Sequence, residues 1–244
     1  MFEVELLDNI IEMLYFPVSE GFESTIFLTE YDNYAKIFKQ YVPDQILLRK
    51  QRMIISLHFT NLCDEFNIIP ETYRLVYTSN GKFSGYFMVP IPGKTLDEYC
   101  EESSTEKKLT VLKNLEDSIK IINEHNYCLA DFNPQNILVS SDLSVRFVDI
   151  DSFCFMNESS KNMFTNYKYV CPYTKVIDKM YNRYSFYALA LDMLFGLNKV
   201  KSNKKLVVNL IRKNNDLPEK IKTKLTYFVM VRSKSKLLKL EPLF

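Results

Sequence analysis

The sequence of 244 residues has only five glycines and no tryptophan. A loop that cradles phosphate groups normally uses several glycines, so little material is left for one. The aromatic bulk comes instead from 18 phenylalanines and 16 tyrosines. The hydrophobic share of 47% and the charged share of 25% are ordinary for a folded soluble protein. A chain of this length can bury one large core or two modest lobes.

Paired cysteines and long apolar runs are also missing. The five cysteines are odd in number and widely spaced, and none forms a C-x-x-C pair, which argues against a zinc site and against a disulfide framework. The N-terminus carries acids where a signal peptide has basic residues. The most apolar segment, 186–197, is too short to span a membrane and contains Asp192. We therefore expect a cytoplasmic protein with reduced thiols and no transmembrane segment.

The net charge of +1 conceals an asymmetry along the chain. Residues 199–244 carry 13 Lys and Arg against three acids, a balance of +10, which leaves −9 for the preceding residues. Such a basic segment suits an acidic partner, an anionic membrane surface or nucleic acid. The alternative is a solvated basic face, or one that pairs with the acidic part of the same chain.

The hydrophobic pattern changes along the chain from strand-like to helical. Residues 1–90 contain short aromatic and β-branched runs and one helical pattern, and Pro90-Ile91-Pro92-Gly93 then forms a stiff connector. We expect an α+β protein with a β-rich first lobe (1–90) and a mainly helical second lobe (91–244), together one domain. The expected strands are 25–30, 34–38, 73–77, 86–89, 137–139 and 145–148, and the expected helices are 45–57, 104–125 and 184–197, followed by basic helices.

Three polar residues lie around the two short strands of the second lobe. Asp131 is followed five residues later by Asn136, which opens the first strand, and Asp149 closes the second strand thirteen residues after that. Amide and carboxylate oxygens at adjacent strand ends are suitable ligands for Mg²⁺. A separate aspartate on the preceding loop can orient and deprotonate an incoming hydroxyl group. This spacing therefore predicts phosphoryl-transfer chemistry, although a polar turn between two strands is the simpler explanation.

The segments ADFNPQNILV and FVDIDSF resemble the protein-kinase superfamily, whose catalytic loop and metal motif read H-R-D-x-x-x-x-N and D-F-G. In detail they are similar to bacterial eukaryotic-like Ser/Thr kinases that carry D-x-N-P-x-N and D-x-D-S-F. The resemblance implies a bilobal protein-kinase-like fold with a shortened C-terminal end. It also implies that Asp131 is the catalytic base, that Asn136 and Asp149 bind Mg²⁺, and that Asp151 occupies the position of the D-F-G glycine.

The resemblance extends to the segments that would bind ATP. Residues 19–27 stand where such kinases have the glycine-rich loop, and only Gly21 is retained, with Ser24 in place of a later glycine. Residues 34–38 resemble the third strand, which makes Lys36 the lysine that contacts the α- and β-phosphates, with Lys39 as its competitor.

The connector has a counterpart in the same family. Residues 85–93 resemble the fifth strand and the hinge of these kinases, with Met88 as the gatekeeper and with Val89 to Ile91 offering backbone groups to adenine. A plain buried strand would look alike in sequence.

Several positions depart from the family pattern. The helix after the lysine strand, 45–57, has no acidic residue to pair with that lysine. Leu129 and Ala130 replace the His-Arg pair, and Asn133 stands in place of the usual lysine. Asn182 replaces the aspartate that anchors the central helix of the large lobe. These departures affect the part of the site that holds ATP more than the part that binds metal.

The resemblance implies an enzyme that uses ATP and Mg²⁺ to phosphorylate Ser or Thr of a protein whose identity the sequence does not give. Two alternatives stay open. One is a pseudokinase that binds nucleotide or serves as a scaffold, which the missing helix glutamate and the reduced glycine loop favour. The other is a small-molecule kinase of the aminoglycoside- or choline-phosphotransferase type.

Overall fold

A computed structural model describes residues 3–14, 17–31, 34–42, 47–163, 165–196 and 203–244. The chain divides into two compact units, Met1–Pro92 with Arg146–Asp151, and Gly93–Val145 with Ser152–Phe244. Each unit is described by itself below. Helices and strands are both well represented, so the α+β class predicted from the sequence is confirmed.

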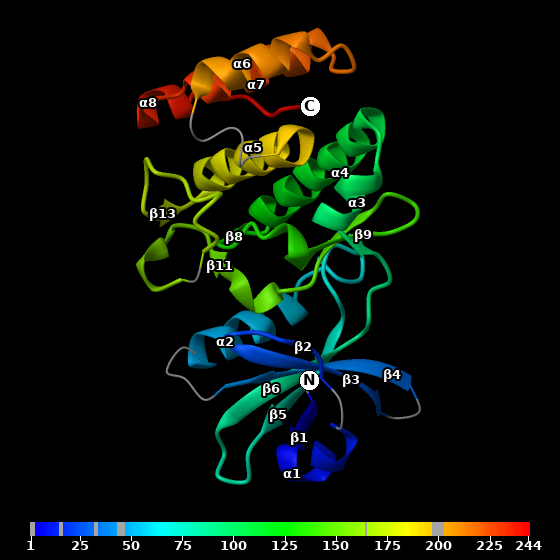
Figure 1. Cartoon of the computed structure of the whole chain (residues 1–244). Helices are drawn as coiled ribbons and strands as arrows, with labels where there is room; N and C mark the ends of the chain where they lie inside the picture. The colour runs from blue at the N-terminus through cyan, green and yellow to red at the C-terminus, as the bar shows by residue number, and fades with distance from the viewer. Residues whose placement is uncertain (1–2, 15–16, 32–33, 43–46, 164, 197–202) are drawn as a thin grey trace. The chain divides into compact units, whose positions relative to one another are not determined.

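The first unit is built around a six-stranded sheet with the strand order β1-β5-β6-β4-β3-β2 (Figure 1). Strand β1 pairs parallel with β5, and the other neighbours are antiparallel. A four-residue helix and a short 3₁₀ helix follow β1, and helix α2 packs on β5 and β6. The elements are β1 (Glu3–Leu6), α1 (Leu7–Ile10), η1 (Ile11–Met13), β2 (Pro17–Glu20), β3 (Ser24–Tyr31), β4 (Tyr34–Tyr41), α2 (Leu47–His58), β5 (Thr72–Tyr77) and β6 (Phe83–Met88).

The strands expected in this unit are present, and each is within a few residues of its predicted bounds. The turn between β5 and β6 includes Gly81, whose φ of 78° is in the left-handed region that favours glycine. Helix α2 begins at Leu47, while the predicted start at Gln45 lies outside the described residues.

The two faces of the sheet carry different side chains. On one face Phe38 of β4 packs on Phe87 of β6, with ring centroids 5.0 Å apart, in a core that also includes Ile10 and Val76. Successive residues of a strand point to opposite faces. The next residue pair in this register, Lys39 and Tyr86, therefore lies on the other face.

The second unit is mainly helical (Figure 1). Helix α4 begins after Ser104, whose hydroxyl accepts a hydrogen bond from the amide of Lys107, as the sequence predicts for an N-cap. The elements that begin in this unit are β7 (Lys94–Thr95), α3 (Leu96–Glu102), α4 (Thr105–Glu124), β8 (Tyr127–Leu129), η2 (Pro134–Asn136), β9 (Ile137–Val139), β10 (Val145–Phe147), β11 (Phe153–Phe155), β12 (Glu158–Ser159), η4 (Ser160–Asn162), β13 (Val176–Ile177), α5 (Lys179–Phe195), α6 (Lys204–Lys213), α7 (Glu219–Met230) and α8 (Lys234–Leu237). A further 3₁₀ turn, η3 (Ile150–Ser152), contains the last boundary between the units.

Helices α4 and α5 pack together and form the core of the second unit. The spacing of Leu109, Leu112, Leu115, Ile119 and Ile122 predicts one apolar face of α4; the last four are buried and Leu109 is half-buried. Helix α5 begins at Lys179, five residues before the predicted start, because Asp178 caps it by accepting a hydrogen bond from the amide of Tyr181. The predicted end at Leu197 lies outside the described residues.

The basic C-terminal segment folds into α6, α7 and α8. It packs through apolar side chains such as Val207, Ile211 and Leu225, while most of its lysines and arginines are exposed. Across the described parts of the chain, none of the helices combines the length and apolar character needed to cross a membrane.

The five cysteines are free thiols, and four of them are buried. Burial raises the pKa of Cys128 from 9.0 to about 12 and that of Cys100 to about 11. A thiol with a raised pKa stabilises the fold fully below its unfolded pKa, and this contribution is lost as the pH rises toward the folded pKa.

We therefore expect the free energy of unfolding to fall as the pH rises from 9 to about 12. Urea unfolding at successive pH values measures this fall, and Cys128→Ala should show a shallower slope than the unchanged protein. Equal slopes for the two proteins would mean that Cys128 does not contribute to the alkaline loss of stability.

Candidate functional site

The loop that carries Asp131 follows β8 and is fixed by helix α5. The side chain of Asn182 accepts a hydrogen bond from the Leu129 amide at 3.1 Å and donates one to the Leu129 carbonyl oxygen at 2.7 Å. Asn182 is fully buried, so these two bonds satisfy polar groups that water cannot reach. Asn182 therefore holds the strand immediately before the Asp131 loop.

Asp131 and Asn136 lie together, as their spacing predicts. Asn133 caps the short helix η2, with Pro134 in its first turn, and this turn brings Asn136 back toward Asp131. The Asn136 side-chain amide donates to Asp131 Oδ2 at 3.4 Å. The other Asp131 oxygen, Oδ1, accepts a hydrogen bond from the backbone amide of Asn166 at 2.7 Å.

Asp149, the third member of the predicted trio, belongs to the first unit and lies beside Lys39. The Lys39 ammonium group forms ion pairs with Asp149 and with Asp151, the latter at 2.6 Å. Lys39 comes from β4, lies on the face of the sheet opposite Phe38 and is 6% exposed. The predicted trio is thus divided between the units, with Asp131 and Asn136 in one and Asp149 in the other.

The two carboxylates beside Lys39 have different electrostatic environments. Burial and the negative charge of Asp151 raise the pKa of Asp149. Burial alone would raise the pKa of Asp151 as well, but Lys39 and Lys50 outweigh it and lower that pKa. Burial tends to lower the pKa of Lys39, but Asp149 and Asp151 overcome this and raise it well above 10.5. Lys39 is therefore charged at neutral pH.

Lys50 of helix α2 is the second ammonium group in this cluster. It forms ion pairs with Asp151 at 3.1 Å and with Glu23 at 2.9 Å. Sequence reasoning did not assign a function to Lys50, although its spacing from Met53, Ile54 and Leu57 placed it on the buried face of the helix. A lysine at such a position is a signal, because lysine is almost never fully buried unless it is paired.

Lys36, the lysine predicted to contact phosphate, lies elsewhere. Its ammonium group is 4.2 Å from the centroid of the Tyr73 ring, and the rings of Tyr73 and Phe87 are neighbours at 5.9 Å. This is the sheet face that carries Phe38, because residues two apart in a strand point the same way. The structure therefore brings Lys39 to the carboxylates and leaves Lys36 on the opposite face.

Gly21 and Ser24, the predicted phosphate loop, form the tight turn between β2 and β3. The Gly21 amide donates to the Ser24 carbonyl oxygen at 2.9 Å, so it is already used within the hairpin. Gly21 does not have a positive φ, and an added Cβ would lie 3.4 Å from the Ser24 carbonyl oxygen, an ordinary contact. This turn does not require glycine for its own conformation.

The predicted hinge follows strand β6. Met88 is buried and pairs with Ile37 of β4 and Thr72 of β5. The Val89 amide donates to the Glu71 carbonyl oxygen at 2.9 Å, so Val89 has only its carbonyl group to offer. Proline has no N–H group, so Ile91 is the only backbone donor between Pro90 and Pro92.

Strand β6 passes very close to the backbone of Lys39 at Gly85. A Cβ atom added at Gly85 would lie 2.2 Å from the Lys39 carbonyl oxygen, much too close for any side chain. Glycine at position 85 therefore allows β6 to pair closely with β4 beside Lys39.

Asn136 and Asp149, the residues predicted to bind Mg²⁺, carry side-chain oxygens and belong to different units. The Asp149 side chain is 26% exposed, and the Asn136 amide and Asp149 carboxylate are oxygen ligands of the kind that Mg²⁺ prefers. Within the described residues, no group of three or more His, Cys, Asp and Glu side chains is arranged to hold a metal ion.

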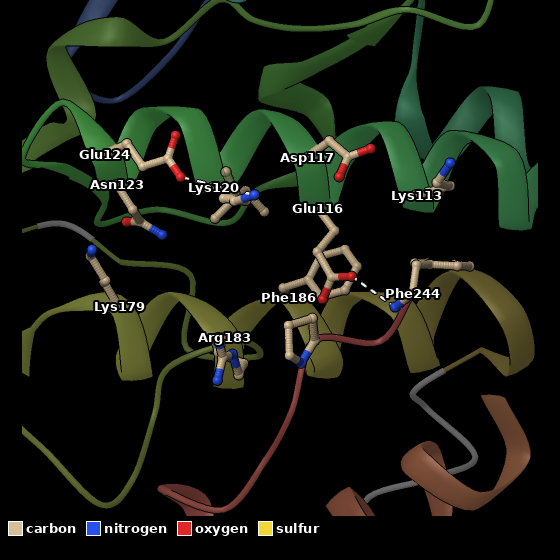
Figure 2. A pocket seen from close by; sticks show the side chains of 12 residues that line it. Lys113, Glu116, Asp117, Lys120, Asn123, Glu124, Lys179, Arg183, Phe186 and Phe244 are labelled. Carbon is tan, nitrogen blue, oxygen red and sulfur yellow. Dashed lines mark hydrogen bonds and ion pairs between the residues drawn. The ribbon is translucent and has the colours of Figure 1, made fainter. Parts of the chain in front are cut away.

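Each unit also has a hollow away from these residues. In the second unit, a cavity of about 460 Å³ lies between α4, α5 and the end of the chain, where Glu116 accepts hydrogen bonds from the Leu243 and Phe244 amides (Figure 2). In the first unit, a cavity of about 750 Å³ lies between α2 and the β5–β6 hairpin. None of the predicted site residues lines either cavity.

Comparison with known proteins adds no family assignment: the chain matches no protein-family model, and no curated protein matches it in sequence.

Proposed function

We propose that this protein is an ATP- and Mg²⁺-dependent phosphotransferase with a bilobal protein-kinase-like fold, acting on Ser or Thr hydroxyl groups of a protein. The observation that carries the proposal is the ion pair between Lys39 and Asp149. Lys39, a buried lysine of strand β4, is held against the first aspartate of the D-x-D-S-F segment. Lysine and metal-binding aspartate are the two charged groups that phosphoryl transfer requires beside the phosphates.

The residues of each unit take separate roles in this proposal. Asp131 orients the acceptor hydroxyl group and removes its proton. Asn136 and Asp149 would be the protein's ligands for Mg²⁺, and Lys39 takes the role that the sequence resemblance gave to Lys36. The Val89 carbonyl group and the Ile91 backbone are the groups offered to adenine. When bound, ATP with Mg²⁺ supplies the phosphoryl group and neutralises its developing charge.

A second candidate is a nucleotide-binding module that transfers no phosphate. Two observations favour it. The Asn166 amide already donates to Asp131 Oδ1, the carboxylate that would receive the proton. The Gly21 amide is used inside the β2–β3 hairpin, which leaves fewer donors for phosphate. Both candidates use Lys39, and they differ in whether Asp131 acts on a substrate.

Replacing the two lysines of β4 tests the shared part of the proposal. Lys39→Met should weaken ATP binding about 30-fold, because charged hydrogen bonds to phosphate are lost. Lys36→Met removes the same charge from the other face of the same strand and should change the dissociation constant less than about threefold. Calorimetric titration of ATP with Mg²⁺ measures both, after circular dichroism has established that each variant is folded.

The reverse order, with Lys36→Met the more damaging change, would return the phosphate role to Lys36. If the unchanged protein binds no ATP, both candidate functions fail.

A further inference from the structure

Asp151 makes three polar contacts inside the first unit and is almost completely enclosed. Its Oδ1 atom pairs with the Lys39 ammonium group at 2.6 Å and accepts a hydrogen bond from the Tyr86 hydroxyl group at 3.3 Å. Its Oδ2 atom pairs with the Lys50 ammonium group at 3.1 Å. The Asp151 side chain is 1% exposed, compared with 26% for Asp149. Both Asp151 oxygens are thus occupied by groups of the protein itself.

This difference in exposure separates the functions of the two aspartates. The Asp149 side chain is partly exposed to solvent, so its carboxylate can bind a metal ion from solution as well as Lys39. Asp151 cannot reach a bound molecule without breaking its contacts with Lys39 and Lys50. The Asp151 carboxylate binds the ammonium groups of Lys39 and Lys50. These contacts connect β4, α2 and the D-x-D-S-F segment.

Helix α2 offers no carboxylate for this purpose. The described part of the helix, Leu47–His58, contains no acidic residue, and its buried polar position is occupied by Lys50. The Tyr41 ring lies beside both ammonium groups, with its centroid 5.5 Å from Lys39 Nζ and 5.1 Å from Lys50 Nζ. The charges are therefore the reverse of a lysine-to-helix-glutamate pair: the helix supplies the cation, and Asp151 supplies the anion.

Building on the proposed function, we propose that Asp151 is the positioning residue that holds Lys39 for the phosphates, and that Lys50 holds Asp151 in turn. In this proposal Asp149 supplies a carboxylate oxygen to Mg²⁺, and Lys39 keeps its contact with Asp151. The pair between Lys50 and Glu23 extends the same network to the β2–β3 turn. The carboxylate that positions the lysine has moved from the helix to the second aspartate of D-x-D.

The first experiment needs no nucleotide. It compares the urea unfolding midpoints of Lys39→Met, Asp151→Asn and the double variant. If Asp151 holds Lys39, Asp151→Asn leaves a buried ammonium group with one partner fewer, and adding Lys39→Met should cost much less than it does alone. Additive effects of the two changes would overturn the inference, whatever the protein binds.

The second experiment measures the ATP dissociation constant without Mg²⁺ and again with it. The variant Asp151→Asn/Lys50→Met removes one charge of each sign, so the buried cluster stays balanced and the fold is protected. It should weaken metal-free ATP binding about tenfold, because Lys39 is no longer held in place. Arg52→Met, which removes an exposed cation from the same helix, is the matched control. An equal loss in the control, or no loss in the double variant, would overturn the inference.

Moving the carboxylate from position 151 to helix α2 tests whether a carboxylate positions Lys39 or whether Asp151 only stabilises the fold. Lys50→Glu combined with Asp151→Asn moves the acid to the helix, and Glu23→Gln removes the like charge that would face it. This triple variant should regain ATP binding to within about threefold of the unchanged protein. Binding as weak as in Asp151→Asn/Lys50→Met would overturn positioning by a carboxylate. If the unchanged protein binds no ATP, the proposed function fails, and the unfolding experiment still decides whether Asp151 holds Lys39.

Discussion

Asp131→Asn is expected to reduce phosphoryl transfer about 1,000-fold, with little change in ATP affinity, because general-base catalysis contributes a factor of about 10² to 10⁴. Asparagine has nearly the same shape as aspartate but cannot accept a proton. Its side-chain oxygen can still accept the hydrogen bond from the Asn166 amide, and the Asn136 amide can rotate to face the new side chain. The loop after β8 should therefore keep its conformation, and the loss should appear in the transfer step.

The experiment measures transfer of labelled phosphate from ATP to the protein itself and to a generic protein acceptor. A calorimetric titration measures the ATP affinity of the same variants. Asp142→Asn is the matched control, since Asp142 lies in an exposed turn of the same unit. If transfer is present and Asp131→Asn leaves it unchanged, Asp131 is not the base. If ATP binds and no transfer occurs with either residue at position 131, the nucleotide-binding module is the better description.

Four strands of the first unit and helix α2 could be predicted because their signals are local, whereas β1, α1, η1 and β2 were not predicted. Aromatic and β-branched runs separated by turn residues mark the strands, and Gly81 occupies a left-handed position that few other residues adopt. The pair of Asp131 and Asn136 could be predicted for the same reason. The six residues 131–136 form one compact turn, which includes a capping asparagine and a proline.

The choice between Lys36 and Lys39 could not be made from the sequence. Both lysines are in one strand, and an odd separation places them on opposite faces of the sheet. Which face carries the site depends on the partners of β4, and these are brought to it by long-range pairing with β6 and by helix α2. Aromatic residues on both faces hide the usual alternation, since Phe38 and Tyr86 are both buried.

The contacts of Asp151 could not be predicted from the sequence either, because they are long-range. Its partners Lys39 and Lys50 are more than 100 residues away along the chain. The sequence did reveal that the helix lacks an acid, but an absence does not identify the replacement. Only the packing of α2 against the sheet, with Lys50 on the buried face, brings the cation and the carboxylate together.

Asn182→Asp, which introduces the residue usual in the resembling kinases, is expected to destabilise this protein by about 3 kcal/mol or more at neutral pH. The Asn182 side chain both donates and accepts, satisfying the Leu129 carbonyl and amide groups at once. An ionised aspartate can only accept. It would place a charge in a fully buried position and would face the Leu129 carbonyl oxygen without a proton between them.

The destabilisation should depend on pH, and its sign follows from burial. An aspartate at position 182 would have its pKa raised above the value in the unfolded chain, because burial disfavours the charged form. Its protonated form can donate to the Leu129 carbonyl group and so imitates the amide. The folded state then binds more protons than the unfolded state, and the variant loses stability as the pH rises through the raised pKa.

Urea unfolding of Asn182→Asp and of the unchanged protein at pH 5, 6, 7 and 8 should therefore show a gap that widens with pH. Asn182→Ala is the control: it leaves both Leu129 groups unpaired and should be destabilised by about 2 kcal/mol or more. Its gap should stay nearly constant because alanine has nothing to titrate. A gap for Asn182→Asp that is equally constant would mean that water or a rotated side chain relieves the buried charge. The amide at position 182 would then be replaceable, and the strand before Asp131 would be held by its packing rather than by these two hydrogen bonds.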